Sequence, residues 1–379
     1  MKKTIFVLFL AALMLFASCS KNESKSSTSG TTAKTETRTV EKEPDGVKVV
    51  LLTDATGIDD KSFNAAAWRG ILSFYGDGGA GRGTLYENIT AQTADDYVPN
   101  LKNASEADWD LIITTGFTWG DALTEVAALY PDQKYIIVDV DYLPQTPNLT
   151  QYIYEEEQGS YLVGVAAATQ AKADGIANPK FGFVGGVAGA TITKFEIGYI
   201  EGVKSVYPDA QIVDYYVNSW GDPASAKTAA KSMYDSGVYC IFAAAGGSGL
   251  GVINQAKEER LAGKNVWAIG VDSDQYEDGV YTAGKSAVLT SMLKMVENST
   301  LDALNKVKDG TWNGGVVTQN MMNEGVGYSK ANAELKAEAI AAADAAAADI
   351  LSGKLVVDKT YAAAKAKGIA PAGLGAIDD

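Results

Sequence analysis

The 379-residue chain contains no histidine, and this absence removes several classes of chemistry at once. Without imidazole there is no Ser-His-Asp or Cys-His nucleophile, no histidine-ligated zinc and no imidazole proton shuttle. Cysteine is scarce as well, since Cys19 and Cys240 are too few for a disulfide framework. We therefore expect no histidine-dependent enzyme, no disulfide-stabilised small domain, no cofactor and no metal site.

Basic residues are outnumbered by acidic ones. The chain has 32 Lys and Arg against 47 Asp and Glu, which gives a net charge of -15 at pH 7. Because a phosphate backbone would be repelled at long range, we expect no nucleic-acid partner. With 46% hydrophobic residues the chain is long enough for two sizeable cores, so two lobes are expected.

The N-terminus has the pattern of an export signal. Met1-Lys2-Lys3 is positively charged, and Ile5 to Ala17 is an apolar run of about 13 residues, which suits a signal peptide and is too short to span a bilayer. The run ends in Leu15-Phe16-Ala17-Ser18-Cys19, which resembles the lipobox of bacterial lipoproteins, with Phe16 where Leu is more common.

We predict a lipoprotein signal peptide over residues 1–18, lipidation of Cys19 with fatty acids such as palmitate, and a flexible tether over residues 19–46. The tether is rich in Ser, Thr, Lys and Glu and has almost no apolar residue, so it cannot form a core. The expected location is the periplasmic or outer face of a cell membrane, reached by export and held by the lipid anchor. A plain secretory signal, with Cys19 incidental, is the alternative.

A strand, a polar loop and a helix are expected between Val49 and Gly70. Val49 to Leu52 is a continuous apolar run, typical of a strand covered on both faces. In an open parallel sheet, ligands bind beyond the carboxyl ends of the strands. The candidate ligand contacts in this loop are therefore Asp54, Lys61, Ser62, Phe63 and Asn64. Asp54 would either accept a hydrogen bond from the ligand or only fix the loop. The simpler interpretation is an ordinary strand-loop-helix unit.

The same alternation of apolar runs and helical patterns continues along the chain. The expected further strands are Trp109–Thr115, Lys134–Val140, Phe181–Gly186, Gln211–Tyr216, Val238–Ala243, Asn265–Val271, Ala287–Met292 and Leu351–Val357. The expected helices are Asp121–Tyr130, Glu155–Gln170, Thr193–Tyr207, Pro223–Asp235, Gly249–Leu261 and Ala331–Ile350. This pattern predicts an α/β protein with two doubly wound parallel sheets, and a first crossing between lobes near Tyr154.

A phosphate-loop motif, G-x-x-x-x-G-K-[ST], is present at Gly279 to Ser286. A working phosphate loop leaves a buried strand and enters a helix. Here the preceding residues 272–278 are polar and acidic, and the following residues 287–292 have a strand pattern. A nucleotide hydrolase is therefore the disfavoured alternative.

Aromatic and acidic side chains at strand ends suggest a site for a flat, hydroxylated molecule. Phe63 and Trp220 lie in polar loops after apolar runs, where edge packing is the ordinary role. Facing each other across a cleft, they would instead clamp a ring. Asp272 would accept hydrogen bonds from two neighbouring hydroxyls. The glycine-rich segment that begins at Gly246 fits a place where backbone approaches a ligand closely, and does not fit a dinucleotide fingerprint.

Six segments together resemble one family, the Bmp (basic membrane protein) lipoproteins, which include PnrA-type purine nucleoside receptors of ABC importers. The segments are Thr53–Asn64 (TDATGIDDKSFN), Glu157–Ala167 (EQGSYLVGVAA), Gly182–Gly186 (GFVGG), Ala245–Val252 (AGGSGLGV), Gly270–Gln275 (GVDSDQ) and Leu289–Lys294 (LTSMLK). These segments are spread over nearly the whole chain after the tether, and their order and spacing together are specific to the family.

The resemblance implies a type I periplasmic-binding-protein fold whose two lobes are joined by three crossings, near Tyr154, Ser291–Lys294 and Gly325. The first lobe would comprise residues 47–154 plus 294–326, and the second residues 155–293 plus 327–379. The chain would not be an enzyme. As a monomer, it would capture a purine nucleoside such as adenosine, inosine or guanosine by hinge closure, and deliver it to ABC permease and ATPase subunits.

The resemblance also implies roles for individual side chains. Phe63 and Trp220 would lie on the base faces, although other members often have Phe at the position of Trp220. The remaining implied contacts are Asn64 and Asp139 with the base edge, Asp272 and Lys294 with the ribose, and Asp54 and Gly246 in the cleft lining.

Two alternatives remain from sequence alone. A sugar or a signalling molecule would suit the same fold. A phosphorylase or hydrolase acting on nucleosides would need only carboxylates and no histidine.

Overall fold

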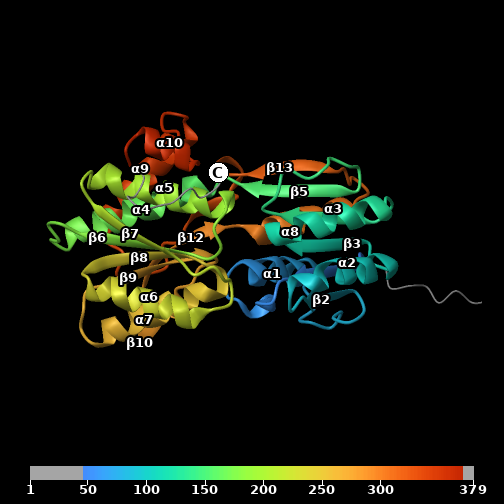
Figure 1. Cartoon of the computed structure of the whole chain (residues 1–379), viewed down its shortest axis with the longest axis horizontal. Helices are drawn as coiled ribbons and strands as arrows, with labels where there is room; N and C mark the ends of the chain where they lie inside the picture. Colours follow the sequence, from blue (N-terminus) through green and yellow to red (C-terminus); the bar gives the residue numbers. More distant parts are fainter. Residues whose placement is uncertain (1–45, 370–379) are drawn as a thin grey trace, which may run out of the picture. The chain divides into compact units, whose positions relative to one another are not determined.

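The computed structural model describes residues 46–369, which contain two six-stranded sheets with helices on both faces (Figure 1). The first sheet has the order β13-β5-β4-β3-β1-β2, and its strands are β1 (Val49–Thr53), β2 (Tyr86–Thr90), β3 (Leu111–Thr115), β4 (Lys134–Val138), β5 (Leu149–Tyr154) and β13 (Gly315–Gln319). The second has the order β14-β12-β9-β8-β6-β7, with β6 (Lys180–Gly185), β7 (Gln211–Tyr216), β8 (Val238–Ala244), β9 (Trp267–Asp272), β12 (Val288–Lys294) and β14 (Val326–Tyr328). Each sheet with its covering helices is called a lobe below.

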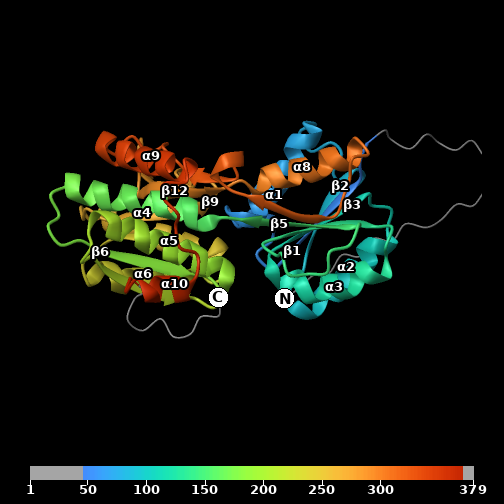
Figure 2. The same cartoon turned by 90° about the horizontal axis from the view of Figure 1, so that it is seen from above.

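The first sheet is entirely parallel and is covered on both faces, which explains why its central strands are apolar throughout. Val49 and Leu51 point into a core shared with α1 (Phe63–Tyr75) and α8 (Val296–Lys308), while Val50 and Leu52 face α2 (Tyr97–Glu106) and α3 (Gly120–Leu129). Figure 2 shows α1 and α8 side by side.

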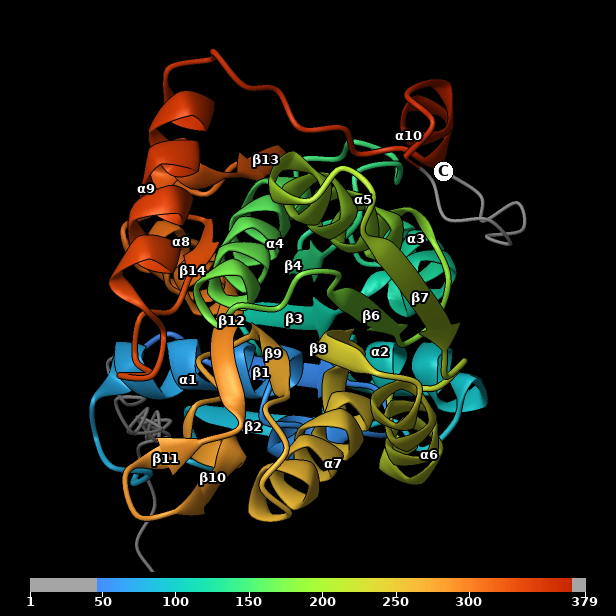
Figure 3. The ribbon, with the colours of Figure 1, turned by 90° about the vertical axis from the view of Figure 1, so that its left-hand side faces the viewer.

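The second sheet is parallel except for β14, which runs antiparallel to β12. One face packs against α4 (Glu156–Ala173) and α5 (Ala190–Val206), and the other against α6 (Pro223–Asp235) and α7 (Gly249–Leu261). Figure 3 shows these two layers, with α9 (Ala337–Leu351) beside α4. The small helix α10 (Tyr361–Ala366) packs on α5.

Three segments of the described chain connect the lobes. The chain passes from β5 to α4 at Glu155, from β12 to α8 at Met295, and from β13 to β14 through residues 320–325. The predicted α/β class with two doubly wound sheets is confirmed. The lobe boundaries given above stay a prediction, and residues 1–45, with the signal peptide, Cys19 and the tether, lie outside the described residues.

One sequence-based expectation about local structure, the strand at Leu351–Val357, is wrong. Leu351 is the last residue of a helix and residues 352–357 form no strand, and the apolar side chain of Val357 is instead buried against the core while Val356 is 78% exposed. The phosphate-loop motif lies in an antiparallel hairpin of β10 (Val280–Thr282) and β11 (Lys285–Ser286). It does not lead from a buried strand into a helix, so it lacks the geometry that cradles a phosphate.

Helices α4 and α5 cross so closely that glycine is required at the contact. A methyl group on Gly202 would collide with the carbonyl oxygen of Tyr161, and one on Gly164 would lie 3.0 Å from the backbone nitrogen of Val203. Neither backbone can yield without separating two fully packed helices.

We predict that Gly202→Ala lowers the free energy of unfolding by about 1–3 kcal/mol, because overpacking outweighs the gain in helix propensity. The measurement is urea unfolding followed by circular dichroism. Gly249→Ala in α7 is the matched control, since its methyl would meet Ala243 at an ordinary 3.5 Å. A stabilised Gly202→Ala protein would show that the crossing is looser than described.

Candidate ligand-binding cleft

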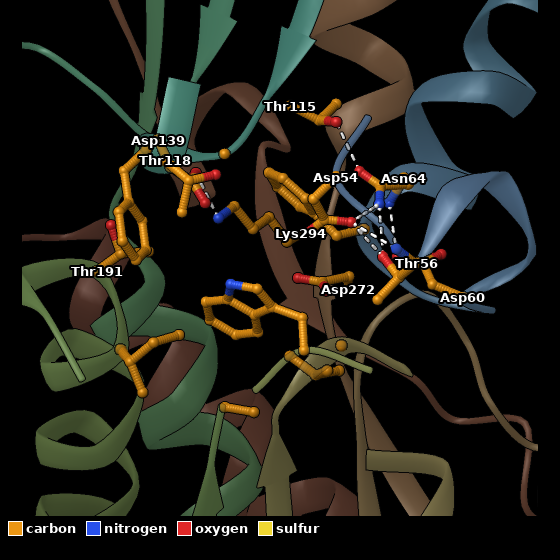
Figure 4. Close-up of a pocket in the computed structure, with 18 of the residues that line it drawn as sticks. Asp54, Thr56, Asp60, Asn64, Thr115, Thr118, Asp139, Thr191, Asp272 and Lys294 are labelled. Carbon is orange, nitrogen blue, oxygen red and sulfur yellow. Dashed lines mark hydrogen bonds and ion pairs between the residues drawn. The ribbon is translucent and has the colours of Figure 1, made fainter. Parts of the chain in front are cut away.

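One cavity, with about 600 Å³ of empty space including the solvent at its mouth, lies where the carboxyl ends of strands from both sheets meet (Figure 4). This edge is the one at which open α/β sheets bind ligands. Its lining includes all eight predicted ligand-binding residues, namely Asp54, Phe63, Asn64, Asp139, Trp220, Gly246, Asp272 and Lys294. Their contact with a ligand stays a prediction.

Two aspartates occupy equivalent places in the two lobes. Asp139 directly follows β4, and Asp272 ends β9. Both have left-handed backbone conformations, with φ of 72° and 63°, which are uncommon for residues other than glycine. The strained turn directs each carboxylate away from its strand and into the cavity, where Figure 4 shows both near Lys294.

Lys294, the last residue of β12, forms the centre of a buried ion-pair network. Its ammonium lies 2.5 Å from Asp139 and 2.9 Å from Glu156, and Lys194 of α5 lies 3.1 Å from Glu156. The ammonium also approaches three aromatic rings within cation–π distance, those of Phe63, Tyr154 and Phe195. The network links the second sheet with the end of β4 in the first.

Burial and mutual charge set the protonation of this network. Burial disfavours the charged form of Lys294, yet Asp139 and Glu156 outweigh it and raise the pKa of the ammonium. Burial raises the pKa of Asp139, and Lys294 offsets this only in part. For Glu156 the two lysines outweigh burial and hold the pKa below its ordinary value.

Asp272 contacts the first lobe through Ser62. The Ser62 hydroxyl donates to Oδ2 of Asp272 at 2.5 Å, and Ser273 donates back to the Ser62 carbonyl at 3.1 Å. Arg69 of α1 donates to the Ser273 hydroxyl at 2.9 Å. Burial raises the pKa of Asp272 to about 7, against the opposing effect of Lys294. Within residues 46–369 no cation forms an ion pair with this carboxylate, and the ammonium of Lys294 pairs with Asp139 and Glu156.

The loop after β1 is fixed by its own carboxylates. Asp60 accepts backbone hydrogen bonds from Ser62, Asn64 and Ala65, which caps α1. Asp54 accepts from the backbone and hydroxyl of Thr56 and from the Asn64 amide. Asp54 thus shapes the loop and also lines the cavity.

The Asn64 side chain is engaged on both sides. Its amide group donates to Asp54 at 3.1 Å and to Thr56 at 2.9 Å, and its oxygen accepts from Thr115 at 2.5 Å (Figure 4). An amide has two donor hydrogens, and both are used. Contact with a ligand would therefore use the second lone pair of the oxygen or replace one of these bonds.

Aromatic rings from both lobes line the cavity. Phe63 and Phe117 come from the first lobe, and Phe195 and Trp220 from the second. The rings of Phe117 and Trp220 meet edge to face, with centroids 6.1 Å apart. The expected pairing of Phe63 with Trp220 across a ligand stays a prediction, and Phe117 is the ring that contacts Trp220 in this structure.

Several residues of the site were not found from the sequence. Glu156 and Lys194 complete the ion-pair network, and Phe117 supplies an aromatic wall. Phe117 follows β3 just as Phe63 follows β1, so its position after an apolar run was an available signal. No sequence signal singled out Glu156, because it lies within a run of three glutamates.

Two kinds of feature are absent from residues 46–369. No helix there combines the length and the apolar character needed to cross a membrane. No group of three or more Cys, Asp and Glu side chains in this range is arranged to hold a metal ion.

We predict that Lys294→Met lowers the free energy of unfolding by about 3–5 kcal/mol at pH 7, because Asp139 is left buried without a close counter-charge and Glu156 keeps only its pair with Lys194. Urea unfolding measures the change, and the deficit should shrink at low pH, where neutral carboxyls need no partner. Lys231→Ala, which removes an exposed pair with Asp235, is the control and should leave stability nearly unchanged. A Lys294→Met protein as stable as the wild type would rule out this role.

Comparison with known proteins identifies the chain's relatives. The family model described as "ABC transporter substrate-binding protein PnrA-like" (Bmp) matches residues 47–360. A Lactococcus lactis protein named "ABC transporter nucleoside-binding protein BmpA" is 35% identical over 94% of this chain and 99% of its own length. A Listeria monocytogenes protein named "CD4+ T-cell-stimulating antigen" is 36% identical over 82% of this chain and 87% of its own length.

Solved structures agree on the fold. An ABC transporter solute-binding protein from Aeropyrum pernix is 25% identical, with a TM-score of 0.74 over 84% of this chain and 96% of its own. A carbohydrate-binding protein from Agrobacterium radiobacter, solved with D-arabinose, has a TM-score of 0.54 at 17% identity over 76% of this chain and 95% of its own, and shows the fold alone.

These matches show the family and its solute-binding role as well as the fold. The matched family binds solutes and is not a family of enzymes, so the alternative of a nucleoside-processing enzyme is set aside. Its members work outside the cytoplasm with ABC permease and ATPase subunits as partners. The chain belongs to the Bmp, or PnrA-like, family of ABC transporter substrate-binding proteins.

Proposed function

We propose that the chain captures purine nucleosides, such as adenosine, inosine and guanosine, for an ABC importer. The observation that carries this proposal is the combination of aromatic rings and buried carboxylates in one cavity between the lobes. Rings suit a planar base, and carboxylates suit hydroxyl and N–H donors. The nucleoside-binding name of the Lactococcus lactis relative supports the same ligand class.

The proposed contacts follow the chemistry of the lining. Phe63 and Trp220 would lie against the base, and Asp139 with Asn64 would meet its edge. Asp272 would accept the ribose hydroxyls, because its carboxylate lies in the lining and has Ser62 as its side-chain partner. Lys294 would donate to the ribose while it remains paired with Asp139. Asp54 and Gly246 would complete the wall.

Transport would depend on closure of the lobes. Contacts such as Ser62 with Asp272 and Phe117 with Trp220 join side chains of different lobes. A ligand that binds both walls favours the state in which the walls are close, and the permease can then recognise that state. The three connecting segments would serve as the hinge.

The membrane attachment belongs to the same proposal. A lipid on Cys19, after removal of residues 1–18, would anchor the protein to a cell membrane, and residues 19–46 would act as the tether. We propose that the protein works as a monomer.

Sugar binding is the second candidate. The Agrobacterium radiobacter protein solved with D-arabinose shares the fold, and Asp272 would suit sugar hydroxyls equally well. The two candidates differ in how much they depend on Phe63, because aromatic stacking on a base contributes about 1–3 kcal/mol.

We predict that the purified protein binds at least one of adenosine, inosine and guanosine, and that Phe63→Ala weakens this binding about tenfold or more. Calorimetry and tryptophan fluorescence measure the affinity. Tyr142→Ala is the control, since this aromatic is 67% exposed and lies outside the cavity lining. A response to D-ribose or D-arabinose with none to the three nucleosides would overturn the proposal in favour of a sugar.

A further inference from the structure

The indole of Trp220 occupies the space that a side chain at residue 186 would need. Gly186 follows β6, and a methyl group on it would collide with Cε3 and Cζ3 of the indole and lie 3.0 Å from Cη2. A methyl group on Gly246 would lie 3.6 Å from Cε3. The cavity wall formed by Trp220 is thus backed by two glycines at the ends of neighbouring strands.

The backbone of Gly186 is held in place by the second sheet. Its N–H donates to the carbonyl of Ala244 at 3.0 Å, and its carbonyl accepts from the N–H of Asn218 at 2.8 Å. Gly186 does not have a positive φ, so other residues can adopt its conformation. Glycine is needed here for space and not for backbone freedom.

The backbone of Trp220 is held as firmly. The carbonyl of Trp220 accepts from the N–H of Ser248 at 2.7 Å. The fully buried Ser248 hydroxyl donates to the carbonyl of Ser219 and accepts from the N–H of Asp222, both at 2.8 Å. With both main chains fixed, a side chain at residue 186 would displace the ring itself, toward the cavity and Phe117.

We propose that Gly186 is a positioning residue for ligand binding. Because residue 186 has no side chain, the indole of Trp220 can occupy the space beside it. The position of the indole in turn sets the width of the cavity. This inference rests on the proposed function, because the width matters only if Trp220 contacts the ligand. It also links residues 186 and 220, since a smaller ring at position 220 leaves room for a methyl group at position 186.

The test is a double-mutant cycle with adenosine, inosine and guanosine as probes. Gly186→Ala is expected to weaken the affinity of the full-length protein about tenfold or more. In a Trp220→Phe background the same change is expected to alter affinity less than about threefold, because the colliding atoms are gone. Gly249→Ala is the control, and urea unfolding confirms that each variant is folded.

The spectrum of Trp220 gives a second measurement that needs no ligand. Subtracting the fluorescence of Trp220→Phe from that of wild type isolates Trp220, and Gly186→Ala is expected to shift this difference spectrum as the ring moves. An unchanged difference spectrum would overturn the inference, as would a loss of affinity equal in both backgrounds or a Gly186→Ala protein that binds like wild type. If wild type binds none of the probes, the proposed function fails, and the spectrum alone then decides whether residue 186 positions Trp220.

Discussion

The rest of the cleft depends on the buried ion pairs of the Lys294 ammonium. It is almost completely buried, and it pairs with Asp139 at the end of the first sheet and with Glu156 at the first connecting segment. A buried charge is tolerated only when it is paired, so the strand ends that carry these groups must stay close together. The ion-pair network therefore fixes the part of the cavity nearest the three connecting segments. The position of the remaining walls would depend on contacts with the ligand.

Strand ends supply the rest of the site for a common reason. In a parallel sheet the carboxyl ends share one edge, and each strand there must turn into a loop. Asp139 and Asp272 make that turn in the left-handed conformation. Phe117 comes shortly after β3, and Phe63 begins α1, after the loop that follows β1. Two sheets with facing edges thus combine carboxylates and aromatic rings around one volume, without any catalytic group being required.

Much of this arrangement could be predicted from the sequence. Runs such as Val49–Leu52 and Val238–Ala243 are apolar because both sheet faces are covered, so their positions and the polar residues after them were visible. Strand β5 was missed because Leu149–Tyr154 mixes polar and aromatic residues, although all but Ile153 are buried between β4 and β13. The strand expected at Leu351–Val357 was wrong because an apolar pattern does not show whether a side chain packs in a sheet or against a helix.

The contacts among the site residues were harder to foresee. The sequence does not show which glutamate of Glu155–Glu157 faces Lys294, because that depends on where the chain crosses between lobes. The engagement of Asn64 with Thr115, and the space behind Trp220 at Gly186, depend on residues far apart in the chain. Such contacts follow from packing and not from local pattern.

The most direct test of nucleoside capture is native mass spectrometry of the protein purified without added ligand. We expect a bound species that is released on denaturation and has the mass of a purine nucleoside. A released sugar, with no nucleoside detected even after incubation with adenosine, inosine and guanosine, would contradict it.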